Sequence, residues 1–157
     1  MVSNMNKYPS DNKKLMQKIE NEIKDNAFGA FFGLIVGDAL GAAVEFKTRD
    51  TFKKVTDMRA GGPHGLDAGY WTDDSSMALC LAESLTEKSF NLEDQLQRYS
   101  KWYRNGYLSS TGSCFDIGNT TASSLEYYEK KKRISTCQRK SSWEWIFNEI
   151  SSSTNLL

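Results

Sequence analysis

The stretch GYWTDDS at residues 69–75 gives the main indication of both a helix and a candidate site in this chain. It places a hydroxyl and two adjacent carboxylates, from Thr72, Asp73 and Asp74, before a run with apolar residues at three- and four-residue spacing. That period predicts a half-buried helix over residues 75–85. One interpretation is a capped helix, because Thr72 or Asp73 can cap the first turn and acids are favoured there. The other is a metal site, because magnesium prefers carboxylate and hydroxyl oxygens.

The composition of the chain excludes several classes of protein. The chain has 157 residues, with 20 basic and 20 acidic side chains, which suits one domain of ordinary size. Because the charges balance, there is no basic footprint for nucleic acid or for an anionic membrane. The three cysteines are widely spaced and form no Cys-x-x-Cys pair, which argues against a disulfide scaffold and against structural zinc, and favours a reducing cytoplasm. The polar first 26 residues lack the apolar core of a signal peptide, so we expect a cytoplasmic protein.

Two helices are predicted upstream of the GYWTDDS stretch. Residues 1–25 predict a polar leader and a charged helix, and residues 26–46 (NAFGAFFGLIVGDALGAAVEF) predict a separate buried helix that Asn26 caps. Acidic residues within the second run disfavour a membrane span. Glycine costs ~1 kcal/mol relative to alanine in a helix, so we expect another helix or a ligand to pass close to a face with glycine at every fourth position. These positions are Gly29, Gly33, Gly37 and Gly41.

Two acids and one histidine in this part of the chain are candidates for a site. Asp38 and Glu45 are seven residues apart, so they project from nearly the same face of a helix. We expect Asp38 to be a buried, hydrogen-bonded group, whereas Glu45 is either a solvated helix end or a site residue. His64, the only histidine, lies in a glycine-rich turn at residues 61–65 and is more typical of a loop beside a site than of a metal ligand.

Two further helices are predicted downstream. Residues 91–106 predict a helix that Asn91 caps and Gly106 ends. The segment FDIGNTT at residues 115–121 precedes a helix-like run over residues 120–128, and Asp116 there is either a turn former or a site residue. Alternation typical of strands is almost absent, so the fold class is all-α. The expected apolar face of the helix at 91–106 consists of Leu92, Leu96, Tyr99 and Tyr103.

Three segments in this order resemble the ADP-ribosylglycohydrolase family. They are GDALG with the following glutamate (residues 37–46), GYWTDD (residues 69–74) and FDIGNTT (residues 115–121), and the resemblance covers about residues 27–128. It implies an orthogonal multi-helix bundle, here truncated, with a binuclear Mg²⁺ site in a central cleft, or Mn²⁺ in some members. It also implies a hydrolase that removes ADP-ribose from a modified acceptor.

The resemblance gives particular residues a role. Thr72, Asp73 and Asp74 match the run that supplies one half of the metal ligands. Glu45 matches the glutamate expected to act at the ribose or at the attacking water. Asp116 matches an aspartate expected close to the metals and the ribose.

Substrate binding is expected at His64, Gly65 and Gly118, with the turn at residues 61–65 near the pyrophosphate. Cleavage at the anomeric carbon passes through an oxocarbenium-like state that carboxylates stabilise while one of them handles the proton of the water. Metals beside the ribose can orient its hydroxyls and activate a bound water. The expected partner is a protein ADP-ribosylated on arginine or another acceptor, or a small molecule that contains ADP-ribose.

The C-terminal part departs from the family. The expected Asp-x-Asp-Thr segment and the Gly-Asn-Gly-Ser-Leu-Met-Arg stretch are missing. One permitted coding of residues 142–155, read one base later, translates as AGNGSLMRLAPVP, which contains the missing stretch. We therefore expect residues 26–130 to be the N-terminal part of the domain and residues 131–157 to be an out-of-frame tail, and we expect impaired activity.

Two other readings stay open. One is a non-catalytic module that binds ADP-ribose or a partner protein, and the other is a small helical protein without a ligand. Binding of ADP-ribose without turnover would favour the first of these.

Overall fold

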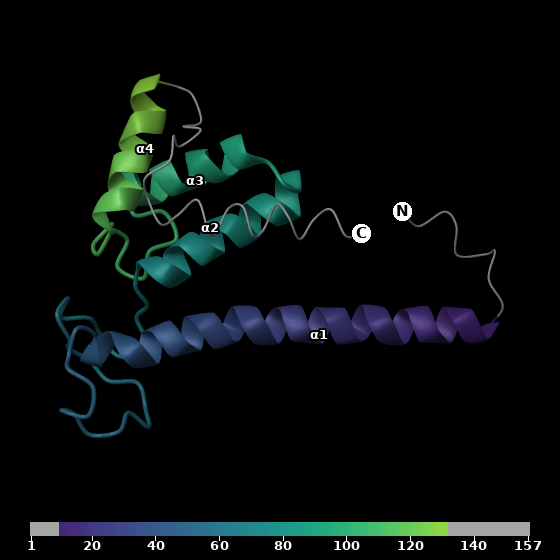
Figure 1. Cartoon of the computed structure of the whole chain (residues 1–157), viewed down its shortest axis with the longest axis horizontal. Helices are drawn as coiled ribbons and strands as arrows, with labels where there is room; N and C mark the ends of the chain where they lie inside the picture. The colour runs from purple at the N-terminus through teal and green to yellow at the C-terminus, as the bar shows by residue number, and fades with distance from the viewer. Residues whose placement is uncertain (1–9, 132–157) are drawn as a thin grey trace. The chain divides into compact units, whose positions relative to one another are not determined.

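The computed structural model describes residues 10–131, and in that range it forms helices without strands (Figure 1). The prediction of an all-α fold is confirmed. The described part belongs to two compact units, one ending at Ile117 and one beginning at Gly118. Most of the predicted out-of-frame tail, residues 132–157, lies outside the described residues. The elements are α1 (Ser10–Gly41), the 3-10 helix η2 (Ala42–Val44), α2 (Asp73–Lys88), α3 (Leu92–Asn105) and α4 (Asn119–Lys131).

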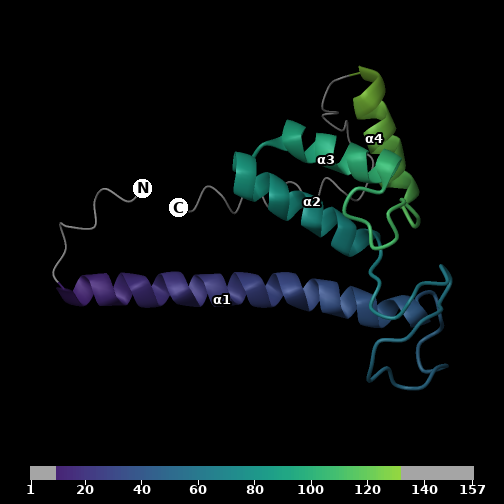
Figure 2. The same cartoon turned by 180° about the vertical axis from the view of Figure 1, so that it is seen from behind.

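Helix α1 joins the two helices predicted upstream into one helix of 32 residues, visible as the long rod in Figure 2. The prediction that Asn26 caps a separate helix is therefore wrong. No proline or glycine interrupts the chain next to Asn26, so nothing in the backbone ends the first helix there. The prediction of a buried helix holds only at its C-terminal end, where Ala39 is 2% exposed, whereas Phe28 and Phe32 are more than half exposed.

The glycine face of α1 meets nothing within the described part of the chain. A Cβ atom added at Gly29, Gly33, Gly37 or Gly41 would have no neighbour within 4 Å, so the close approach predicted there is absent from residues 10–131. By length and composition alone, the helix over Asn12–Val44 would qualify as a membrane span. One such helix is weak evidence for a membrane, because core helices of soluble proteins and signal sequences pass the same test.

Helices α2 and α3 pack side by side in the first unit (Figures 1 and 2). Cys80 of α2 and Trp102 of α3 are almost completely buried. The predicted ends of α3 are confirmed. The Asn91 side chain accepts a hydrogen bond from the Asp94 N–H at 3.0 Å, and Gly106 ends the helix with φ +66°.

The apolar face predicted for α3 is only half buried. Leu92, Leu96, Tyr99 and Tyr103 are all intermediate in exposure, whereas Gln95, Arg98 and Trp102 are the buried side chains. The reason is an ion-pair cluster that the periodicity does not reveal. Arg98 contacts Asp94 and Glu87 at 2.7 Å each and also pairs with Glu83, so a charged side chain lies between α2 and α3.

Candidate functional site

The N-terminus of α2 is capped by Asp38, a residue of α1. Its Oδ2 atom accepts hydrogen bonds from the Thr72 N–H at 3.0 Å, the Ser75 N–H at 3.1 Å and the Ser75 hydroxyl at 2.6 Å. Its Oδ1 atom accepts one from the Thr72 hydroxyl at 2.7 Å. The prediction that Asp38 is hydrogen-bonded is confirmed, but the side chain is only half buried rather than buried. The prediction that Thr72 or Asp73 caps α2 is wrong, because neither side chain makes the capping bond and a carboxylate from another helix satisfies the free N–H groups.

A serine-rich loop after α3 holds the chain in front of α2. The Ser110 hydroxyl donates to the Trp71 carbonyl at 2.6 Å, and the Trp71 indole N–H donates to the Leu108 carbonyl at 3.4 Å. These two bonds join residues almost forty positions apart and place the GYWTDDS stretch against the loop. Sequence analysis missed Ser110, since a serine in a polar loop carries no signal of a specific partner.

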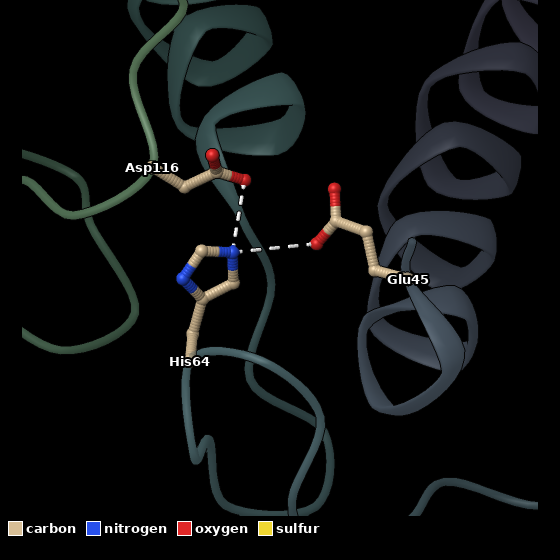
Figure 3. A group of neighbouring side chains, drawn as sticks. All are labelled: Glu45, His64 and Asp116. Carbon is tan, nitrogen blue, oxygen red and sulfur yellow. Dashed lines mark ion pairs between the residues drawn. The ribbon is translucent and has the colours of Figure 1, made fainter. Parts of the chain in front are cut away.

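Three predicted site residues come together in the first unit (Figure 3). Glu45 follows η2, His64 lies in a turn that the paired backbones of Gly61 and Leu66 close, and Asp116 comes from the segment after the serine-rich loop. The His64 Nε2 atom lies 3.2 Å from Asp116 Oδ2 and 3.5 Å from Glu45 Oε2. The prediction that Glu45 is a solvated helix end is therefore excluded.

Backbone conformation at two points supports this arrangement. Asp116 has φ +40°, a left-handed conformation that is strained for a residue with a side chain, so the interpretation of Asp116 as a turn former is supported, while its role in a site stays a prediction. Gly62 has φ +74°, and a Cβ atom there would collide with the backbone of Ala42. Glycine thus lets the His64 turn approach η2, the element that positions Glu45. The Gly-Gly pair at residues 61–62 was the sequence signal for this contact.

Carboxylates crowd this part of the molecule. Burial, together with the negative charges of Asp116, Asp74 and Glu45, raises the pKa of Asp73 to about 6, although its own backbone hydrogen bond acts in the opposite direction. Burial is also the main cause that raises the pKa of Glu45, followed by the charge of Asp116, with His64 acting in the opposite direction. Acids from three distant segments therefore share one electrostatic environment, which is typical of functional sites.

The donors predicted to bind magnesium fit a hard cation. Thr72 is 4% exposed, and because its hydroxyl hydrogen goes to Asp38, its oxygen retains free lone pairs. Asp73 is half buried and Asp74 is exposed, so one carboxylate lies inside and one faces solvent. A divalent cation would offset the repulsion that raises the pKa of Asp73. Thr72, Asp73 and Asp74 thus offer oxygen ligands of the kind Mg²⁺ prefers.

The two glycines predicted to bind substrate have different surroundings. Gly65 is exposed with φ +64°, and nothing lies within 4 Å of a Cβ atom added there, so its backbone is open. Gly118 begins the second unit, where its carbonyl accepts a hydrogen bond from the Ala122 N–H at 3.0 Å at the start of α4. Substrate binding at these two glycines stays a prediction.

Comparison with known proteins places these features in a family. The family model described as ADP-ribosylglycohydrolase matches residues 19–155. A relative from Serratia proteamaculans (strain 568), named ADP-ribosylarginine hydrolase Tri1, is 50% identical over 112 residues, which are 71% of this chain and 30% of that protein. A relative from Rhodospirillum rubrum, named ADP-ribosyl-[dinitrogen reductase] glycohydrolase, is 35% identical over 111 residues, which are 68% of this chain and 35% of that protein.

A solved structure agrees with the sequence comparisons. A chain described as an ADP-ribosylglycohydrolase-related protein complex has 48% identity and a TM-score of 0.56, and the match covers 67% of this chain and 33% of that one. The chain therefore spans about a third of the length of the curated relatives it matches.

Proposed function

This chain belongs to the ADP-ribosylglycohydrolase family, a family of hydrolases, and we propose that it takes part in the magnesium-dependent removal of ADP-ribose from a modified acceptor such as arginine. The observation that carries the proposal is the shared electrostatic environment of Glu45, Asp73 and Asp116. These acids come from the three segments in which the chain resembles the family. The names of two relatives, which refer to ADP-ribosylarginine and to an ADP-ribosylated reductase, support this class of substrate.

Each acid has a role in the proposed reaction. Glu45, whose pKa is raised by burial, is suited to exchange a proton with the attacking water. Asp116 supplies negative charge beside the oxocarbenium-like centre. Mg²⁺ or Mn²⁺ held by Thr72, Asp73 and Asp74 would supply Lewis-acid chemistry for the ribose hydroxyls and the water.

Asp38 positions the proposed metal donors. Because its carboxylate binds both Thr72 and Ser75, the start of α2 keeps a constant position relative to the end of α1. Glu45 lies a short distance beyond that end of α1, after η2. One carboxylate thus links the elements that carry the proposed metal ligands and the proposed general base.

The test is release of ADP-ribose from an ADP-ribosylated arginine protein by the purified chain, with Mg²⁺ and with chelator. We expect slow turnover with Mg²⁺, because the described residues supply one half of the metal ligands of the family, and no turnover in Asp73→Asn. Equal turnover in Asp73→Asn and in the parent chain would sink the assignment.

The alternative is a module that binds ADP-ribose without cleaving it, and calorimetry together with the turnover assay distinguishes it from a hydrolase. Titration with ADP-ribose in the presence of Mg²⁺ would then give binding in the parent chain, while the turnover assay would give none at any enzyme concentration.

A further inference from the structure

The His64 imidazole lies at ion-pair distance from two carboxylates (Figure 3), although it forms a hydrogen bond to neither. Its Nε2 atom lies 3.2 Å from Asp116 and 3.5 Å from Glu45, and the three ligand atoms all lie within 4.8 Å of one another. Among the described residues, neither His64 Nε2 nor Glu45 Oε2 has a hydrogen-bond partner, although both atoms are shielded from solvent. Shielded polar atoms are normally paired, so these two require an explanation.

The spacing of the three ligand atoms matches a metal centre. Zinc bonds to nitrogen and oxygen are about 2.0–2.1 Å long, so neighbouring ligands of a tetrahedral ion lie about 3.3 Å apart. The two separations from His64 Nε2 lie on either side of that value. One imidazole nitrogen with two carboxylate oxygens is a donor set for zinc and similar first-row dications, whereas Mg²⁺ prefers oxygen alone.

The surroundings of the cluster favour a bound cation. The charges of Asp116, Asp38 and Asp74 all act on Glu45, so negative charge exceeds positive charge at this point. Aromatic rings flank the imidazole, with ring centroids 5.4 Å away for Phe115 and 6.3 Å away for Phe46. Phe46 is 78% exposed, whereas the half-buried ring of Phe115 limits the access of water on its side of the cluster and so strengthens the attraction of the carboxylates for a cation.

We propose that Glu45, His64 and Asp116 form a binding site for Zn²⁺ or a similar first-row transition dication. Its ligands do not include the oxygen donors at the start of α2, Thr72, Asp73 and Asp74. Binding of zinc does not depend on the proposed function. One consequence does rest on it: an ion at this site would occupy the carboxylates of Glu45 and Asp116, so zinc would inhibit the hydrolase reaction.

The test uses the fact that His64 is the only histidine in the chain. When the full chain is labelled with ¹⁵N-histidine, its NMR spectrum reports one imidazole. Zn²⁺ is added with Mg²⁺ present in excess, so that the oxygen donors at the start of α2 do not compete. We expect one equivalent of Zn²⁺ to shift the Nε2 resonance to that of a metal-bound nitrogen and to leave the hydrogen on Nδ1.

Calorimetric titration of substituted chains with Zn²⁺ identifies the ligands. His64→Gln is expected to lower zinc affinity by about 100-fold or more, since loss of an outer partner alone costs 10–100-fold. Asp67→Asn, which removes an exposed acid from the same connection, is the matched control and should bind zinc as the parent does. Cys114→Ser with Cys137→Ser should also retain binding, which excludes thiol ligation at those two positions.

Two results would overturn the zinc site. One is an imidazole spectrum that Zn²⁺ leaves unchanged, which does not depend on any variant folding. The other is equal zinc affinity in His64→Gln and the parent chain. Both measurements report zinc binding rather than turnover. They therefore test the zinc site even if the chain has no hydrolase activity.

Discussion

Asp38 on α1 accepts a hydrogen bond from the Thr72 hydroxyl, with 2.7 Å between Thr72 Oγ1 and Asp38 Oδ1. Its second oxygen, Oδ2, caps the N-terminus of α2. The same carboxylate therefore performs the capping function and orients a proposed metal ligand. The separation in sequence is 34 residues for Thr72 and 37 for Ser75. Because the capping carboxylate belongs to another helix, the cap of α2 also joins α2 to α1.

Replacing Asp38 is expected to weaken both the fold and the site. Asp38→Ala removes the acceptor for two N–H groups and two hydroxyls, and we expect a loss of about 2–4 kcal/mol in the free energy of unfolding, because the buried donors remain unpaired. Urea unfolding of the full chain measures it. Asp67→Ala is the matched control, with an expected change within about 0.5 kcal/mol for an exposed position.

Asp73 is expected to destabilise the metal-free chain at neutral pH. Its folded-state pKa of about 6 lies above the ordinary 3.8, so the stability associated with its proton is fully present below about pH 3.8 and is lost as the pH rises through 6. Asp73→Asn should therefore raise the free energy of unfolding at pH 7.5 in chelator. We expect about 1 kcal/mol, less than the full shift implies because the side chain is half exposed.

The same variant should remove the response to metal. Mg²⁺ is expected to raise the midpoint of thermal unfolding of the parent chain at pH 7.5 and to leave Asp73→Asn unchanged. An equal rise in both proteins would show that the cation binds elsewhere.

Arg98 is expected to be the most sensitive charged residue of α3. Arg98→Met leaves the carboxylates of Glu83, Glu87 and Asp94 close together without a cation, and so it should lower the free energy of unfolding. Arg49→Met at an exposed position is the control. Equal stability of the two variants would mean that the cluster contributes nothing to the packing of α2 on α3.

Two glycines distinguish backbone strain from steric collision. Gly106 and Gly112 both have positive φ, at +66° and +74°, so an alanine at either position is strained by about 1 kcal/mol. A Cβ atom at Gly106 would also collide with the backbone of Gly112 and Ser113, whereas one at Gly112 would meet nothing within 4 Å. Gly106→Ala should therefore lose clearly more stability than Gly112→Ala in urea unfolding.

Local patterns were sufficient to predict the helices but not their contacts. The Asn91 cap and the Gly106 terminus of α3 were predicted because each rule concerns a single turn of backbone. The burial of Arg98 was not predicted, since an arginine on a polar helix reads as exposed until its three carboxylate partners are seen. The continuous helix α1 was predicted as two helices, because Asn26 is a residue type that can cap a helix, yet no helix breaker stands beside it.

The amino-acid sequence by itself determined the all-α class, the positions of most helices and the residues that resemble a family, because these depend on local periodicity and on short motifs. Only the tertiary structure decided which groups meet. It assigned the cap of α2 to Asp38, brought His64 between Glu45 and Asp116, and placed Asp73 among other acids. Hydrogen bonds and charges act through space over a few ångströms, so residues far apart in sequence become partners only when the chain folds.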